Sequence, residues 1–150
     1  MRTVEVHVDI ARPAEEVFAF VADHENNPRW QRGMRTCRWT SDDPPGVGST
    51  YEQEARFLGR PVRSTFRVSE YEPPRRIRIE TVSGTFPIDV TRTISPLGPD
   101  ECRVSAEIGG GPTGRLARFA EPVLRTIVRR SVERDYRRLE VLLEADQPGA

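Results

Sequence analysis

The sequence predicts an α+β fold that combines an antiparallel sheet of about seven strands with two short helices after the first strand and one long C-terminal helix. Two patterns indicate this fold. Between residues 34 and 109, segments with one mostly apolar face alternate with turn signals rich in proline and glycine. The short links favour antiparallel pairing, because parallel strands need long crossovers. After residue 111, apolar side chains recur at steps of three and four, which is the period of a helix with one buried face.

The N-terminal segment predicts a strand followed by a short helix. Residues 4–10 alternate apolar and polar side chains, as a strand with one buried face does. Pro13 suits the first helical position, and the glutamates at 15–16 suit the positive end of the helix dipole. The polar segment 23–28 then predicts a second helical turn or a loop, which leads to Trp30.

The central strands each carry one mostly apolar face, which we expect to turn inward. Side chains two residues apart share a face of a strand. By this spacing the inner faces hold Tyr51, Gln53, Ala55 and Phe57, then Ser64, Phe66 and Val68, then Ile77, Ile79 and Thr81, then Ile88, Val90, Arg92 and Ile94, and then Val104, Ala106 and Ile108.

The C-terminal segment predicts one long amphipathic helix, which Pro122 is expected to kink or restart. Its outer face is rich in arginine with acidic residues interleaved, so we expect that face to be solvated. The stripe predicted to face the sheet consists of Leu116, Phe119, Val123 and Ile127. We expect residues 1–145 to form a single domain and the tail 146–150, which has nothing to bury, to fray.

Composition argues against several classes of function. The chain has 23 basic and 23 acidic residues, so its formal net charge is zero and no chain-wide field attracts nucleic acid or an anionic membrane. All 23 basic residues are arginine, which excludes Schiff-base chemistry and a phosphate-binding loop lysine. The longest apolar run, 17–22, is too short to cross a bilayer, and residues 1–10 lack the layout of a signal peptide. We therefore expect a cytoplasmic protein without stable membrane insertion.

Four segments carry a more specific pattern. The strand-to-helix segment IARPAEEVFAFVAD at 10–23 closes with PRW at 28–30, and VGSTY at 47–51 and YEPPRRI at 71–77 follow. Together with the terminal helix, they resemble the START-like (SRPBCC) superfamily, and in particular its polyketide cyclase/dehydrase-like branch. The resemblance implies a helix-grip fold, in which a curved sheet wraps the C-terminal helix around a small-molecule cavity. The superfamily includes lipid carriers, cyclases, aromatases and hormone receptors, so it implies no shared catalytic set.

The cavity that this resemblance implies would be lined by aromatic and aliphatic side chains and would bind an apolar or aromatic ligand. Arg92 lies in phase with apolar neighbours, and an unpaired buried charge is costly. It is therefore a ligand anchor, half of an ion pair with a core carboxylate, or a strand-end side chain that reaches solvent. The residues predicted to bind the ligand are Trp30, Tyr51, Gln53, Phe66, Thr81, Val90, Arg92, Phe119 and Val123.

The remaining aromatic and histidine side chains have plainer interpretations. We expect Trp39 in the core and Trp30 at the rim of the cavity. His7 and His24 lie among polar residues without a second metal ligand or a nucleophile at recognisable spacing, so we expect both to be solvated. No cluster has the spacing of a metal site, and we expect neither a metal nor a cofactor. No catalytic residue can be assigned.

The leading functional hypothesis is the binding of a hydrophobic small molecule, such as a lipid, a quinone or a polyketide-like compound, between the sheet and the C-terminal helix. The alternative is an enzyme of the polyketide cyclase/dehydrase type, in which Arg92 would stabilise an enolate. A further alternative is a protein-interaction module with a vestigial pocket. An enzyme needs a titratable group aimed into the cavity, a carrier needs volume and an opening, and a module needs an exposed apolar patch. We expect no nucleic-acid partner, and a homodimer stays open.

Overall fold

The computed structural model describes residues 4–57, 59–84, 87–110 and 115–145, with the backbone alone at residues 57, 115–121 and 124. The strands are β1 (Val4–Ile10), β2 (Met34–Trp39), β3 (Thr50–Phe57), β4 (Arg60–Glu72), β5 (Arg76–Gly84), β6 (Ile88–Gly98) and β7 (Glu101–Gly110). The helices are α1 (Ala14–Ala22), the short 3-10 turn η1 (His24–Asn26), α2 (Asn27–Trp30) and α3 (Arg115–Ala145).

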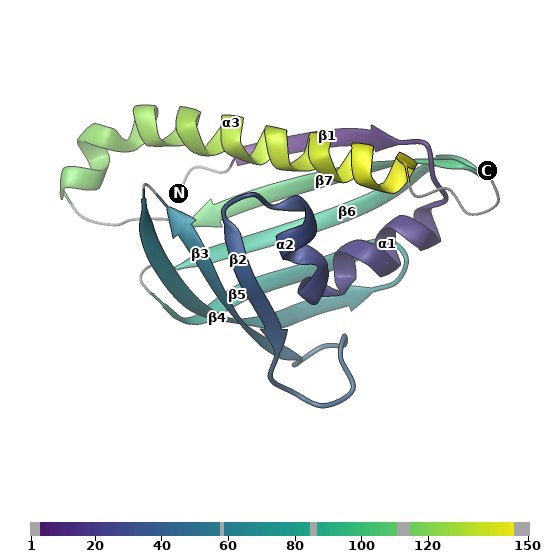
Figure 1. The fold of residues 1–150 in the computed structure, drawn as a ribbon, viewed down its shortest axis with the longest axis horizontal. Coiled ribbons are helices and arrows are strands. Elements are labelled where there is room, and N and C mark those ends of the chain that lie inside the picture. The colour runs from purple at the N-terminus through teal and green to yellow at the C-terminus, as the bar shows by residue number, and fades with distance from the viewer. Residues whose placement is uncertain (1–3, 58, 85–86, 111–114, 146–150) are drawn as a thin grey trace.

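The strands form one antiparallel sheet in the order β1-β7-β6-β5-β4-β3-β2. Strands β2 to β7 follow one another as a meander, and β1 joins the edge beside β7, with Val4 opposite Ile108 and Ile10 opposite Cys102. The sheet curls, and the helices lie on its concave side, with α3 crossing it lengthwise (Figure 1). The predicted α+β class, the strand number and the two short helices after the first strand are confirmed.

The hydrophobic core lies between the concave face of the sheet and the helices. In β1, Val4 and Val6 are buried while Glu5 and His7 are exposed, as the alternation predicts. Burying an aliphatic side chain stabilises a fold by about 1.5–3 kcal/mol, so the alternation fixes which face turns inward. Helix α1 adds Val17 to the same core.

Helix α3 continues through Pro122 from Arg115 to Ala145. Proline removes one backbone hydrogen bond and its ring crowds the preceding turn, which bends a helix. In Figure 1 the first turns of α3 are set at an angle to the rest. The expected kink is therefore present, and the helix is not interrupted there.

The prediction of which stripe of α3 faces the sheet is wrong for the two residues whose side chains are described. Val123 and Ile127 are 63% and 43% exposed, whereas Tyr136 and Leu139 are buried. Ile127 precedes Tyr136 by about two and a half turns, so the two side chains project from opposite sides of the helix. The helix docks through its C-terminal half, where Val132 also packs against the core. Outside the described residues lie the side chains of Leu116 and Phe119 and the tail 146–150.

Candidate functional site

Aromatic side chains line the concave face where β2, β3 and β4 meet η1. The rings of Tyr51 and Phe66 stack with centroids 5.3 Å apart, and both side chains are buried. His24 stacks on Tyr51 at 4.5 Å, and Trp39 meets Tyr51 edge-on at 5.5 Å. These contacts join residues from strands that pair in the sheet and from the segment between α1 and β2.

Arg92 lies on the concave face of β6 and is only 5% exposed. Its Nε donates a hydrogen bond to the hydroxyl oxygen of Tyr136 on α3 at 2.8 Å, and its guanidinium carbon lies 5.4 Å from the ring centroid of Trp30. Within the described part of the chain it forms no ion pair with a carboxylate, and its Nη1 has no hydrogen-bond partner. Arg92 is therefore buried and does not pair with a described core carboxylate.

Several other buried polar atoms also lack partners among the described residues, and those of His24, Tyr51 and Trp30 belong to side chains near Arg92. They are His24 Nε2, Asn27 Oδ1, Trp30 Nε1, Gln31 Nε2 and the Tyr51 hydroxyl. More than nine in ten buried polar groups in folded proteins have a hydrogen-bond partner, so such a cluster in one part of a core asks for an explanation. We call Arg92, Tyr51, His24, Trp30 and Asn27 the polar cluster.

His24 corrects the expectation that it is solvated. It is fully buried although Asp23 and Glu25 flank it, because the 3-10 turn directs it inward onto Tyr51. Burial, and then the nearby charge of Arg92, hold the pKa of His24 well below its ordinary value. The imidazole is therefore neutral at pH 7. No sequence signal indicates that His24 is buried, because all its neighbours in the segment 23–28 are polar or proline.

The tautomer of His24 follows from its one neighbouring amide. Asn27 Nδ2 lies 3.5 Å from His24 Nδ1, and the same amide nitrogen lies 3.9 Å from the Sγ atom of Cys37. With the amide in this orientation, Nδ1 accepts and the ring proton is assigned to Nε2. The unpartnered Nε2 of His24 is then a hydrogen-bond donor.

Neighbouring titratable side chains are also uncharged. Burial raises the pKa of Tyr51 well above its ordinary value, so its hydroxyl keeps its proton. Burial raises the pKa of the Cys37 thiol to about 12, which leaves it a poor nucleophile at neutral pH. At pH 7 the polar cluster therefore carries one positive charge, on Arg92, and its other members are neutral.

The structure places the other predicted ligand-binding residues unevenly. Gln53 is half-buried, and its partner in the β3–β4 pairing is the buried Ser64. Val90 is buried, while the Thr81 hydroxyl is already used in hydrogen bonds with the backbone of Ile88 at 3.0 and 3.3 Å. Phe119 lies outside the described side chains, and Val123 faces solvent. Trp30, which was expected at the rim of the cavity, is 1% exposed and belongs to the core, and Trp39, which was expected in the core, is only half-buried.

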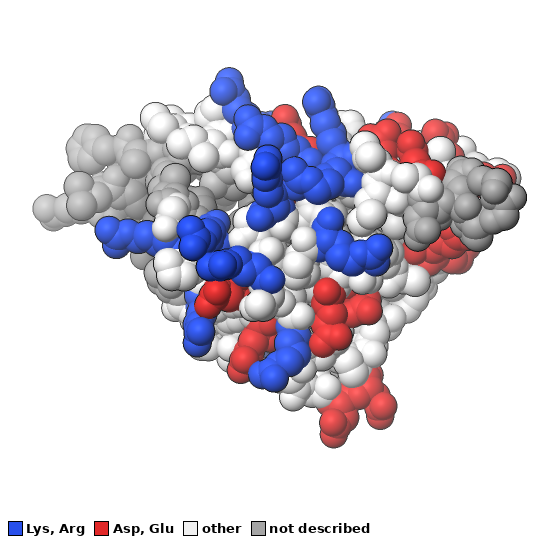
Figure 2. All heavy atoms as spheres, in the orientation of Figure 1, with Lys and Arg blue, Asp and Glu red and all other residues white. Residues whose placement is uncertain are grey.

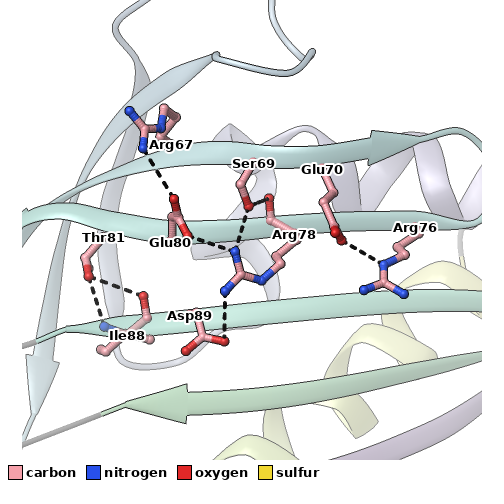
Figure 3. A network of polar contacts seen from close by, with 9 residues as sticks. All are labelled: Arg67, Ser69, Glu70, Arg76, Arg78, Glu80, Thr81, Ile88 and Asp89. Atoms are coloured by element: carbon pink, nitrogen blue, oxygen red, sulfur yellow. Dashed lines mark hydrogen bonds and ion pairs between the residues drawn. The ribbon is translucent and has the colours of Figure 1, made fainter.

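The outer face of the sheet is occupied by ion pairs. Arg78 of β5 contacts Glu80 at 2.8 Å and Asp89 at 3.5 Å, and Glu80 also contacts Arg67 of β4 (Figure 3). A hollow of about 560 Å³ opens at β2, β3 and β4, lined mostly by outer-face side chains such as Arg38 and Arg63, and also by Gln53 and Ser64. Exposed ion pairs of this kind contribute at most about 1 kcal/mol each to stability. They account for the charged side chains on the outer face of these strands, so no ligand is needed to explain them.

A second hollow, of about 410 Å³, lies between α2 and α3. Pro28, Trp30, Arg32 and Arg138 line it. Arg138 donates to the backbone oxygen of Trp30 at 3.2 Å. Trp30 lines this hollow and also contacts Arg92, so one side chain connects the hollow to the polar cluster.

Neither a metal centre nor a membrane segment emerges from the described residues. No three His, Cys, Asp or Glu side chains among them lie close enough to hold a metal ion together. None of the helices described is long and apolar enough to span a membrane.

Comparisons with solved structures agree on the fold. A crystal structure from Thermus thermophilus superposes with a TM-score of 0.84 at 19% identity, covering 97% of this chain and 100% of the other. A START superfamily protein from Mycobacterium smegmatis gives 0.81 at 19% identity, with 97% and 99% covered. An aromatase/cyclase from a Streptomyces species gives 0.75 at 16% identity, with 95% and 93% covered. These identities are low enough that the likeness shows the helix-grip fold alone.

Among curated proteins, no relative matches the chain with significance. The family model described as polyketide cyclase/dehydrase and lipid transport matches residues 1–144. A match over nearly the full length assigns the family as well as the fold. The chain belongs to the polyketide cyclase/dehydrase and lipid transport family.

Proposed function

We propose that this protein binds a hydrophobic small molecule between the concave face of the sheet and α3, with the polar cluster holding its polar end. The observation that carries the proposal is the state of Arg92. A guanidinium that is 5% exposed, with one nitrogen unpartnered and no described carboxylate beside it, is costly to maintain in a core. A ligand oxygen at Nη1 would remove that cost.

The surroundings of Arg92 fit such a ligand. The aromatic side chains of Tyr51, Phe66 and Trp30 are buried in the same core, and aromatic residues with a few convergent polar groups are typical of small-molecule sites. The hydrogen bond from Arg92 of β6 to Tyr136 of α3 places this polar group between the sheet and the helix. No proton transfer or covalent step is required of these residues.

Dye binding by two matched tryptophan variants tests the proposal. Gln53→Trp adds a large side chain on the concave face of β3, and Glu52→Trp adds the same side chain to the exposed outer face of the same strand. We expect the wild type and Glu52→Trp to bind the neutral dye N-phenylnaphthylamine, with a rise in its fluorescence. Gln53→Trp should bind it at least about tenfold more weakly because the space is filled. Equal binding by all three proteins would place the dye elsewhere and refute the proposed site.

The second candidate is an enzyme of the cyclase/dehydrase type, and the donors of the polar cluster favour it. Arg92 Nη1 and the Tyr51 hydroxyl could stabilise the enolate oxygen of a poly-β-carbonyl chain folded in the same space. Incubation with a synthetic poly-β-carbonyl thioester, followed by mass spectrometry and chromatography of the products, separates the candidates. If the substrate cyclises no faster with the protein than without it, the enzyme candidate is excluded and ligand binding remains as the proposed function.

A further inference from the structure

The positive charge of Arg92 has no described counter-charge inside the protein. The groups around it are neutral, because His24 and Cys37 carry no charge at pH 7 and Tyr51 keeps its proton. The carboxylates of Asp23 and Glu25 act on nearby Cys37, and both already accept hydrogen bonds from Trp39, each at 3.0 Å. The described interior therefore carries one unbalanced positive charge.

The unpartnered atoms of the polar cluster are also mostly donors. Arg92 Nη1 and Trp30 Nε1 can only donate, and His24 Nε2 carries the ring proton in the tautomer assigned above. The Tyr51 hydroxyl can donate as well as accept, and Asn27 Oδ1 is the one pure acceptor in the cluster. A molecule that satisfied these atoms would bring acceptor oxygens rather than donors.

We infer that the ligand is a hydrophobic monoanion, such as an aromatic or fatty carboxylate, whose charged oxygens are bound by Arg92. The inference rests on the proposed function and adds the charge of the ligand to it. One negative charge would balance one guanidinium, and the buried aromatic side chains near Arg92 provide an apolar environment for the rest of the molecule. A neutral lipid would leave the positive charge unbalanced.

The hollow between α2 and α3 supports the same ligand charge. Arg32 and Arg138 line it, together with Trp30, which lies against Arg92. Arg138 shares its charge with Asp135 at 3.3 Å, whereas Arg32 is exposed. Positive side chains around an opening raise the local concentration of anions.

Two dyes with the same apolar frame isolate the charge. Anilinonaphthalene sulfonate is a monoanion, and N-phenylnaphthylamine is its neutral counterpart without the sulfonate. We expect the wild type to bind the sulfonate more tightly than the neutral dye. Arg92→Met should weaken the sulfonate about 10- to 100-fold, as the loss of a charge-assisted hydrogen bond implies, and change the neutral dye by less than about threefold.

Arg67→Met is the matched control, because it removes an arginine from the exposed outer face of β4 and should change neither affinity. Tyr51→Phe provides a second variant that keeps the aromatic ring. It should weaken the sulfonate about 3- to 10-fold and leave the neutral dye unchanged.

The outcomes separate the two proposals. If the neutral dye binds the Gln53-lined space while the sulfonate binds no more tightly, or if Arg92→Met weakens both dyes equally, the anion inference is overturned and the proposed function stands. If neither dye binds the wild type, the proposed function fails and the inference fails with it. A sulfonate preference that disappears in Arg92→Met supports both.

Discussion

Arg92 donates a hydrogen bond to the hydroxyl oxygen of Tyr136 rather than to a carboxylate, and lies over the ring of Trp30. Removing one partner of a buried ion pair costs about 3–5 kcal/mol, because the other charge is left unpaired. Here no described carboxylate would be left unpaired. The effect of a substitution on stability therefore tests the role of this residue directly.

We expect Arg92→Met to change the free energy of unfolding of the ligand-free protein by less than about 1 kcal/mol. The variant leaves the Tyr136 hydroxyl without its donor, which destabilises, and it removes an unbalanced buried charge, which stabilises. Urea titration followed by circular dichroism measures the difference. A loss of about 3 kcal/mol or more would assign Arg92 a structural role that the contacts described here do not explain.

His24 gives the stability a dependence on pH with a defined sign. Its pKa is lowered in the fold by burial and then by Arg92, while in the unfolded chain it returns to its ordinary value of 6.5. Below that value the unfolded chain binds a proton that the folded chain does not. Stability therefore falls as the pH decreases below about 6.5, by up to about 1.4 kcal/mol per pH unit.

His24→Phe should flatten this part of the profile. The variant keeps a ring stacked on Tyr51 but has no group to protonate. We expect the melting temperature of the wild type to fall between pH 7 and pH 5 and that of His24→Phe to fall less. His7→Gln, at an exposed position on β1, serves as the control and should follow the wild type. Parallel profiles for wild type and His24→Phe would argue against a buried neutral imidazole.

Among the elements, α3 carries buried and exposed apolar side chains close together in its C-terminal half. Leu139 is fully buried, whereas Val141, two residues further, is 67% exposed. We expect Leu139→Ala to cost about 2–5 kcal/mol and Val141→Ala to change stability by less than about 0.5 kcal/mol. Thermal and urea unfolding of the two variants measure this. Similar losses at both positions would mean that the helix packs on another face.

Sequence periodicity predicted the elements better than their orientation. The alternation in β1 and the inward phase of Tyr51 and Phe66 depend on neighbouring residues only, and they were predicted correctly. The sequence left three interpretations of Arg92 open, and the structure shows it buried. The buried face of α3 was predicted wrongly. Arginines interrupt the apolar positions between Ile127 and Tyr136, so the sequence fits two different apolar faces of the helix. Burial of His24 depends on how η1 meets β3, a contact between distant segments that no local pattern encodes.

Across the whole molecule, charge is uneven although the formal net charge is zero. Residues 115–145 contain eight arginines and five acidic residues, so this segment is positive and the remainder of the chain is negative by the same amount. Figure 2 shows arginine side chains crowded over the middle of α3. The opening near Trp30, which Arg138 of α3 helps to line, therefore lies on the positive side of the protein.

This asymmetry predicts a salt-dependent association rate for an anionic ligand. Between low salt and about 0.5 M sodium chloride, we expect the association rate of anilinonaphthalene sulfonate to fall several-fold, because salt screens charges beyond roughly a Debye length. The rate for neutral N-phenylnaphthylamine should change little. Stopped-flow fluorescence measures both. Equal salt dependence of the two dyes would show that the positive side does not steer the ligand.

The central claim is that the interior around Arg92 holds a small molecule, and native mass spectrometry of the gently purified protein tests it most directly. We predict a one-to-one complex with a hydrophobic acid that is released on denaturation and detected in negative-ion mode. The same species should be missing from Gln53→Trp and depleted in Arg92→Met, and retained by Glu52→Trp. A wild-type protein that carries no small molecule, and that captures neither dye when they are supplied, would contradict the claim.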